Sequence, residues 1–157
     1  MGGLTIRVCR TPDDFEQARR LVRDYATWLG MDLSFQHVDD EFAGFETMYG
    51  PPGGLFLLTL TEAGELAGGA GLRRLDAQTA EMKRLYVYES HRRRGLGRRL
   101  CEELLRRAKD LGYAKVRLDT VARLVEANAL YERLGFRDIP PYRPNPDPTA
   151  RFMERAL

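Results

Sequence analysis

A short run of arginines and glycines is the part of the sequence best suited to chemistry. It reads Arg92-Arg93-Arg94-Gly95-Leu96-Gly97-Arg98, and it lies between a predicted strand and a predicted helix. The first backbone N–H groups of a helix have no partner within the helix, and the positive end of the helix dipole lies behind them. Glycines let an anion approach such a backbone closely, and arginines add charged donors. The segment therefore predicts a site for a phosphate or diphosphate group.

Alternative roles for this segment are less consistent with its position. A solvated basic patch, or a nucleic-acid or localisation signal, has no reason to place its glycines at a strand-to-helix junction. A dinucleotide-binding turn needs a third glycine where this chain has Leu100, and a P-loop needs a Gly-Lys-Ser or Gly-Lys-Thr that does not follow. The formal net charge is only +2, from 25 Lys and Arg against 23 Asp and Glu, so the overall charge does not favour nucleic-acid binding.

The elements that must position this segment follow from hydrophobic periodicity and turn residues. The sequence predicts strands at 4–10, 55–61, 65–75, 79–88, 115–120 and 150–156, and helices at 12–29, 39–49, 95–111 and 124–134. No internal repeat or flexible linker divides the 157 residues. The order of elements predicts one α/β or α+β sheet domain over residues 1–157.

Two motifs resemble those of the GNAT superfamily of acetyl-CoA-dependent N-acetyltransferases. The pyrophosphate loop of that family has Arg or Gln, two residues, Gly, one residue, and Gly or Ala, which Arg92, Gly95 and Gly97 match. Downstream, Asn128-Ala129-Leu130-Tyr131 with Leu134-Gly135-Phe136 resembles the family's second cofactor motif. With the order of elements, the resemblance covers nearly the whole chain. It implies that the arginine-rich loop binds the pyrophosphate of acetyl-CoA.

The resemblance also implies a fold and a set of contacts. It implies a mixed central sheet, flanked by helices on both faces, whose fourth and fifth strands splay apart around the pantetheine arm. Backbone groups of Leu85 and Val87, on either side of Tyr86, would pair with the pantetheine amides. Asn128 would hydrogen-bond to the same arm, and Tyr131 would lie near the thioester sulfur. A homodimer is an expectation from the family alone.

Acetyl transfer from a thioester to an amine has three needs, which are a neutral amine, a donor for the negative oxygen and a proton for the departing thiolate. The backbone N–H of Leu85 is the predicted donor for the oxygen. Tyr131 is the predicted acid, because the pKa of a phenol, about 10, lies not far above the roughly 8.5 of a thiol. Glu81, acting through a water, is the predicted base. Strand alternation puts it on the face of Leu85, which Lys83 and Val87 share, unless a bulge intervenes. A surface or salt-bridged glutamate is the alternative.

The two cysteines, Cys9 and Cys101, carry no predicted chemistry. They are too few for a disulfide framework or a zinc site, and Cys101 lies on the apolar stripe of a predicted helix. We therefore expect no metal, no acyl-enzyme and direct transfer from the cofactor. The longest apolar run is far short of the roughly 20 residues of a membrane span, and no signal pattern opens the chain, so a cytoplasmic location is expected.

The sequence gives the least information about which amine accepts the acetyl group. The residues expected to border it are Trp28, Met31, Phe35, His37, Tyr142 and Arg143. Such aromatics would suit an apolar or aromatic amine, and Asp39, Asp40 or Glu46 could receive a cation, although ordinary packing would account for them more simply. The leading hypothesis is an N-acetyltransferase acting on a primary amine of a small molecule or a protein. The alternative is a non-catalytic acyl-CoA-binding regulatory module.

Overall fold

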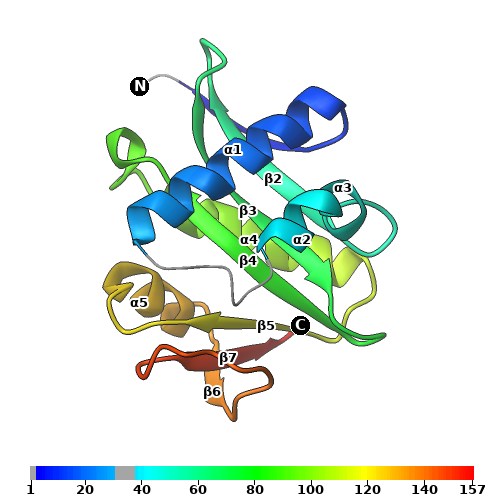
Figure 1. Ribbon diagram of the computed structural model, residues 1–157, viewed down its shortest axis with the longest axis vertical. Coiled ribbons are helices and arrows are strands. Elements are labelled where there is room, and N and C mark those ends of the chain that lie inside the picture. The colour runs from blue at the N-terminus through cyan, green and yellow to red at the C-terminus, as the bar shows by residue number, and fades with distance from the viewer. Residues whose placement is uncertain (1–2, 31–37) are drawn as a thin grey trace.

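The computed structural model describes residues 3–30 and 38–157, which form a seven-stranded sheet with helices packed on it (Figure 1). The strands are β1 Leu4–Val8, β2 Leu55–Thr61, β3 Leu66–Arg74, β4 Thr79–Val87, β5 Lys115–Thr120, β6 Arg137–Ile139 and β7 Arg151–Ala156. The helices are α1 Pro12–Leu29, α2 Val38–Ala43, α3 Phe45–Met48, α4 Leu96–Asp110 and α5 Val125–Arg133, with a 3-10 turn at Glu89–His91. None of the helices described is long and apolar enough to cross a bilayer.

The sheet is mixed, with the strand order β1-β2-β3-β4-β5-β7-β6. The strands β1 to β4 pair antiparallel in sequence order, β4 and β5 pair parallel, and β7 lies antiparallel between β5 and β6. The mixed sheet that the family resemblance implies is therefore confirmed.

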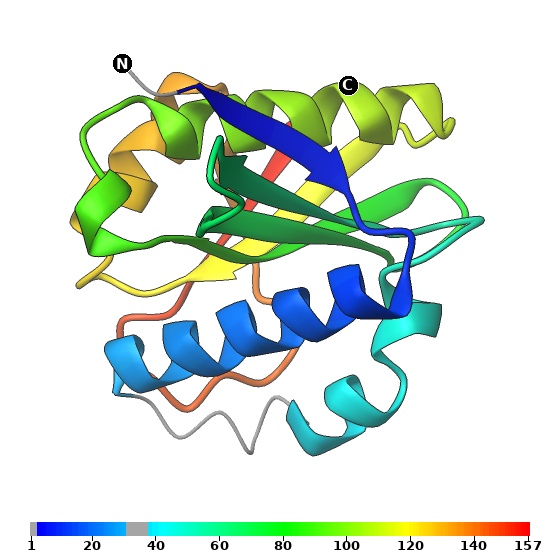
Figure 2. The same ribbon diagram turned by 90° about the horizontal axis from the view of Figure 1, so that it is seen from above.

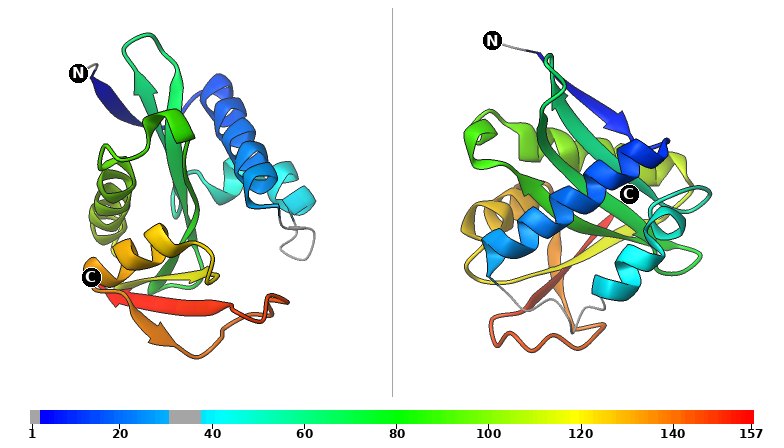
Figure 3. Two further views of the ribbon diagram at one scale, coloured as in Figure 1. Left: turned by 90° about the vertical axis from the view of Figure 1, so that its left-hand side faces the viewer. Right: turned by 45° about the horizontal axis from the view of Figure 1, so that its top comes forward.

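The helices lie on both faces of this sheet, as expected. Figure 2 shows α1, α2 and α3 on one face and α4 with α5 on the other, and the left view of Figure 3 shows the same two layers edge-on. Each layer buries its own apolar cluster. The cluster under α4 contains Leu100, Leu104 and Leu118, and the cluster under α1 contains Leu21, Phe45 and Phe56. Burial of these two apolar faces against the sheet provides the main driving force for the fold.

The ends of α1 show how closely local sequence signals set this fold. The side-chain oxygen of Thr11 accepts a hydrogen bond from the backbone N–H of Asp14 at 3.1 Å, and the carboxylate of Asp14 accepts one from the N–H of Thr11 at 3.2 Å. Gly30 ends the helix in the left-handed conformation, with φ of 65°. The bounds of α1 match the predicted helix at 12–29, and both ends are set by residues close in the sequence, because capping is a local property.

β4 and β5 pair only over their first three residues. Thr79 to Glu81 lie opposite Lys115 to Arg117, and beyond that point β4 runs on to Val87 without β5 beside it. Figure 1 shows the two strands diverging from their common start. The predicted splay is confirmed, and it leaves one edge of β4 open for a ligand.

A bulge in β4 overturns one prediction. Tyr86 lies opposite Gly69, but Lys83 lies opposite Gly71. Between these two pairs β4 has two residues where β3 has one, and the first of the two, Arg84, has φ of +61°. The bulge reverses which face the side chains take, because strand side chains alternate. Leu85 and Val87 consequently pack on the α4 side with Met82, whereas Glu81 and Lys83 lie on the α1 side. The prediction that Glu81 and Lys83 share a face with Leu85 and Val87 is wrong.

Two smaller differences have simple causes. The predicted helix 39–49 is two short helices interrupted at Gly44, where the backbone leaves helical geometry. The strand β6 was not predicted, since its three residues are largely exposed and show no apolar alternation.

Candidate active site

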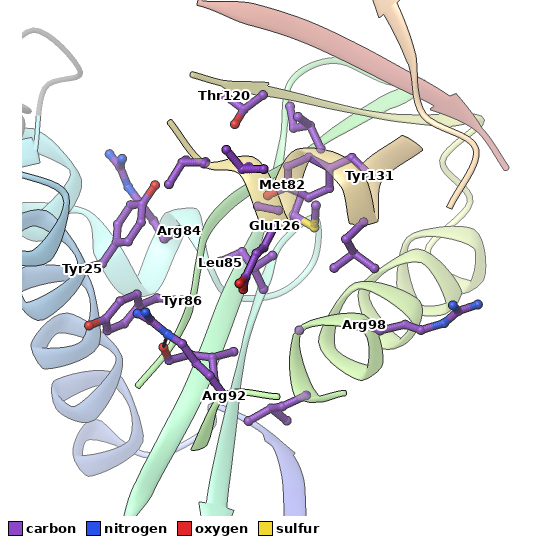
Figure 4. Close-up of a pocket in the computed structure, with 18 of the residues that line it drawn as sticks. Tyr25, Met82, Arg84, Leu85, Tyr86, Arg92, Arg98, Thr120, Glu126 and Tyr131 are labelled. Carbon is purple, nitrogen blue, oxygen red and sulfur yellow. Dashed lines mark hydrogen bonds between the residues drawn. The ribbon is translucent and has the colours of Figure 1, made fainter. Parts of the chain in front are cut away.

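The splay between β4 and β5 opens into a groove of about 950 Å³. Its walls come from β4, the end of β5, the loop after the 3-10 turn, the start of α4, and α5, with Tyr25 and Trp28 of α1 along one side. Figure 4 shows Tyr131 of α5 and Met82 and Leu85 of β4 around the same space. The groove thus joins the two motifs that the sequence singled out.

The start of α4 presents unpartnered backbone donors to this groove. Gly95 precedes the helix with φ of 71°, and no side chain caps the helix at that point. The N–H of Arg99 is the one that reaches the carbonyl of Gly95, at 3.1 Å. The N–H groups of Leu96, Gly97 and Arg98 precede it and so have no carbonyl partner within the helix. Three donors and a positive helix end converge where a diphosphate was predicted.

The space at Gly97 fits a ligand rather than the protein's own packing. A Cβ added there would meet only the Cδ2 atom of Leu130, at an ordinary 3.7 Å. A glycine inside a helix costs roughly 0.5–1 kcal/mol relative to alanine, and the described residues around Gly97 leave room for a larger side chain. A phosphate oxygen approaching the backbone would occupy the space that a Cβ fills. The residues present therefore fit a diphosphate group.

The arginines of the loop divide into two sets. Arg92, Arg93 and Arg98 line the groove, whereas Arg94 lies 3.3 Å from the Nδ1 atom of His91 and is not part of the groove lining. The guanidinium of Arg92 lies 4.7 Å from the centre of the Trp28 ring, and its Nε donates to the carbonyl of Val87 at 2.9 Å. Arg92 is thereby held in place between the loop, α1 and β4.

The open edge of β4 offers backbone groups to an extended ligand. The N–H of Tyr88 donates to the carbonyl of Ala67 on β3 at 3.0 Å. Because alternate residues of a strand direct their backbone groups to opposite edges, those of Val87 and Leu85 face the splay. The Val87 carbonyl retains a second lone pair beside its bond from Arg92. This edge could therefore pair with a chain of amides as a missing strand would.

Tyr131 lies where the groove passes between β4 and α5. Its side chain is buried against Phe136, with ring centres 5.8 Å apart, and its hydroxyl has no hydrogen-bond partner in the described part of the chain. Burial, and then the nearby Cys101, raise the pKa of Tyr131 well above its ordinary value. The phenol is therefore protonated at neutral pH and has a proton to give.

Asn128 is placed differently from the expectation. The hydroxyl of Thr120 donates to its Oδ1 at 2.7 Å, and its Nδ2 donates to the carbonyl of Val121 at 3.0 Å. Asn128 thus ties α5 to the end of β5, and its side chain is not part of the groove lining. A direct contact between Asn128 and a pantetheine arm stays a prediction.

Glu81 is fully buried in a cluster of donors. Its carboxylate accepts hydrogen bonds from the Nε of Arg73 at 2.7 Å and from the hydroxyl of Tyr142 at 2.6 Å, and it forms an ion pair with Arg143. Tyr142 and Arg143 come from the proline-rich segment before β7, so this segment closes over β4. Glu81 is therefore salt-bridged, as the alternative interpretation expected. The role of Glu81 as a base stays a prediction.

Glu41 of α2 is a site residue that the sequence analysis missed. Its side chain is 2% exposed and accepts hydrogen bonds from Arg84 at 2.7 and 3.3 Å and from the hydroxyl of Tyr49 at 2.9 Å. It therefore ties α2 and α3 to the strained residue of the β4 bulge. Arg84 is 43 residues away in sequence, and no local pattern links the two.

The remaining candidates for the acceptor side fall into three groups. Trp28 lines the groove and is 48% exposed, so its ring is available to a ligand. Glu46 pairs with Arg19 at 3.4 Å and does not line the groove. Met31, Phe35, His37 and the side chains of Asp39 and Asp40 lie outside the described residues.

The pair of Glu41 and Arg84 makes stability depend on pH. Burial acts to raise the pKa of Glu41, but hydrogen bonds and charge from Arg84 outweigh it and the pKa is lowered. A carboxylate with a lowered folded-state pKa contributes stability above its unfolded pKa of about 4.3 and loses it as the pH falls through the folded value. Glu41→Gln is expected to cost about 3–5 kcal/mol at pH 7, because it leaves Arg84 buried without its counter-charge.

Urea unfolding at pH 7 and at pH 4 measures this effect. The stability difference between wild type and Glu41→Gln should be smaller at pH 4 than at pH 7. Glu46→Gln is the control, since its half-exposed pair should contribute at most about 1 kcal/mol. A Glu41→Gln cost no larger than that of Glu46→Gln at pH 7 would contradict the assigned pairing.

Comparison with known proteins agrees with this fold. The profile of the Acetyltransferase (GNAT) family matches residues 15–136. An uncharacterized N-acetyltransferase of Schizosaccharomyces pombe is 37% identical over 151 residues, which cover 96% of this chain and 93% of that protein. An acetyltransferase from Streptococcus agalactiae superposes with a TM-score of 0.79 at 23% identity, covering 99% of each chain. A GNAT family acetyltransferase from Elizabethkingia anophelis, solved with acetyl-CoA bound, has a TM-score of 0.66 at 20% identity, covering 98% of each chain.

The fold and the sequence comparisons define the class of this protein as an acetyltransferase. The chain belongs to the GNAT family, as a match over most of its length shows.

Proposed function

We propose that the protein is an acetyl-CoA-dependent N-acetyltransferase that moves the acetyl group directly to a primary amine. The observation that carries the proposal is the uncapped start of α4, with open space beside Gly97, at one end of a splay that leads to Tyr131. The acetyl-CoA in the related Elizabethkingia structure supports the choice of cofactor.

The cofactor would be held mainly by the main chain. The N–H groups of Leu96, Gly97 and Arg98 would bind the diphosphate, with Arg92 and Arg93 adding charge along the groove. The open edge of β4 would pair with the pantetheine amides. Bound in this way, acetyl-CoA supplies an activated acetyl group at the Tyr131 end of the groove.

Two groups would then act on the acetyl group. The backbone N–H of Leu85 follows the bulge at Arg84 and faces the splay, so it would donate to the carbonyl oxygen as negative charge develops there. The hydroxyl of Tyr131 would give its proton to the departing thiolate. Its burial raises the pKa of the phenol, so the proton is on Tyr131 at neutral pH when negative charge develops on the sulfur.

Glu81 would accept the proton that the amine loses, through a water. Its ion pairs with Arg73 and Arg143 hold the carboxylate in position on the α1 face of β4. The hydroxyl of Tyr142, 2.6 Å from the Glu81 carboxylate, fixes its orientation.

The absence of a competent thiol among the described residues supports direct transfer. Burial raises the pKa of both Cys9 and Cys101 to about 12, so neither is a thiolate at neutral pH. An acyl-enzyme on cysteine would need the thiolate form.

Two measurements test the proposal. CoA should raise the melting temperature, by an amount that corresponds to about 2.7 kcal/mol when CoA is present at one hundred times its dissociation constant. Acetyl-CoA with a library of primary amines should release free thiol only when an acceptor is present. Stabilisation by CoA without thiol release for any amine would identify a binding module instead, and the absence of both effects would overturn the proposal.

A further inference from the structure

A buried cluster of charged side chains lies beside the bulge, on the α1 face of the sheet. We call it the acceptor-side cluster. Its members are the cations Arg73, Lys83, Arg84 and Arg143 and the carboxylates Glu41, Glu81 and Asp119. Lys83, Arg84 and Asp119 also line the groove. The cluster therefore lies next to the place where an acceptor amine would meet the acetyl group.

Each carboxylate of the cluster is paired with an arginine. Glu41 binds Arg84 at 2.7 Å, and Glu81 binds Arg73 at 2.7 Å. Asp119 lies 3.6 Å from Arg143, which also pairs with Glu81. Three carboxylates thus face three arginines.

Lys83 is the fourth cation of the cluster, and it has no carboxylate of its own among the described residues. Its Nζ approaches Glu41 only to 3.8 Å, and that carboxylate already accepts from Arg84 and Tyr49. The side chain of Lys83 is 7% exposed. A buried ammonium without a dedicated counter-charge costs several kcal/mol, so its position on a groove wall suggests that a ligand completes the pair.

The electrostatics of Lys83 agree with this geometry. Burial, and then the charge of Arg84, lower the pKa of Lys83 to about 8. The side chain is still mostly protonated at pH 7, and it would be held in that form by an anion bound beside it. Among the described residues the cluster has four cations and three carboxylates, and an excess of one positive charge matches a carboxylate better than a dianionic phosphate.

The diphosphate of the cofactor is too far away to be that anion. It would bind at the start of α4, beyond the end of β4 at Val87. Lys83 lies four residues earlier in the strand, or about 13 Å at roughly 3.3 Å per residue. Lys83 also lies on the α1 face, whereas α4 packs on the opposite face.

We infer that Lys83 binds a carboxylate of the acceptor, and that the substrate is a small amine that also carries a carboxylate, such as an amino acid. The inference presupposes the proposed acetyl transfer and narrows its substrate class. The rings of Tyr25, Trp28 and Tyr86 form an aromatic wall on the same side of the groove, with ring centres 5.6 to 6.4 Å apart. An apolar or aromatic side chain would pack well against that wall.

The test compares matched acceptors that differ only in the carboxylate. The probes are phenylalanine and phenylalaninamide, followed by the other protein amino acids and their carboxamides. Wild type should prefer the acids by about 10-fold or more in kcat/KM, the range expected for one charge-assisted hydrogen bond. The amine of a carboxamide is less basic and more often neutral, so intrinsic reactivity works against this preference.

Lys83→Met should reduce the preference for acids to about twofold or less. Lys109→Met is the matched control, because Lys109 is exposed on α4 away from the groove and its replacement should keep the preference. Equal rates on acids and carboxamides in wild type would overturn the inference while leaving the proposed function intact. A failure to acetylate any amine at all would overturn the proposed function and the inference together.

Melting temperature gives a readout that needs no substrate. Lys83→Met removes a buried charge that shares its one carboxylate among the described residues, Glu41, with Arg84, so it should raise the melting temperature of the ligand-free protein. Lys109→Met should leave it unchanged. A lower melting temperature for Lys83→Met would show that Lys83 is a structural partner of Glu41, and it would overturn the inference.

Discussion

Gly97→Glu is expected to weaken CoA binding by about a hundredfold or more without unfolding the protein. The new carboxylate would occupy the space where a phosphate oxygen approaches the start of α4, and two like charges brought together cost several kcal/mol. The fold should tolerate the change, because the Cβ has room and an acidic side chain in the first turn of a helix is favourable. Calorimetric titration with CoA and the ligand-free melting temperature measure the two effects separately.

The control for Gly97→Glu is Arg99→Glu. Arg99 lies on the same turn of α4, is exposed, and does not line the groove, so it tests whether charge alone explains the loss. We expect Arg99→Glu to weaken CoA binding far less, although it changes the net charge by more. Equal losses of CoA affinity in the two variants would mean that CoA is attracted by the overall charge of α4 and does not bind at Gly97.

Tyr131→Phe is expected to lower kcat by about 10²-fold or more and to leave the affinity for CoA nearly unchanged. General acids contribute roughly 10²–10⁴-fold to rate, and the phenol is the buried acid that borders the predicted position of the thioester sulfur. Stability should not fall, because the hydroxyl has no hydrogen-bond partner among the described residues to lose. Steady-state kinetics and CoA titration measure both parts.

Tyr113→Phe should show the opposite pattern. The hydroxyl of Tyr113 donates to the carbonyl of Gly53, and the residue lies outside the groove lining. Its removal should lower stability by about 1 kcal/mol and leave kcat unchanged. An unchanged kcat in Tyr131→Phe would remove Tyr131 from the proposed chemistry, whatever its effect on folding.

The features that the sequence predicted well depend on neighbouring residues. The bounds of α1 and the apolar stripe of α4 are encoded by residues within one helix. The arginine and glycine run was recognisable because its chemistry and its junction position are both local. Short-range signals of this kind survive in any tertiary context.

The features that it predicted poorly depend on residues far apart. The bulge at Arg84 reverses the faces of β4, yet Arg84 is not a glycine and nothing around it marks a positive φ. Its conformation is held by Glu41, 43 residues away. The carboxylate of Glu81 likewise accepts a hydrogen bond from Tyr142, 61 residues away, and no local pattern links the two.

The bulge also explains why a strained residue lines the groove. A non-glycine residue at positive φ costs of order 1–3 kcal/mol and persists where its surroundings hold it. At Arg84 the buried carboxylate of Glu41 provides that hold. The bulge in turn brings Leu85 onto the face that carries Met82, beside the splay. Glu41 of α2 thus helps to hold the bulge that shapes the open edge of β4.

The central claim is that main-chain amides at the start of α4 donate hydrogen bonds to the diphosphate of the cofactor. Nuclear magnetic resonance of the uniformly labelled protein tests it directly, by following the amide signals of Leu96, Gly97 and Arg98 during titration with CoA and, separately, with pantetheine. We predict that these three amide protons move downfield with CoA, and that pantetheine, which lacks the diphosphate, leaves them in place. Saturation with CoA that shifts signals elsewhere but not these three would contradict the account.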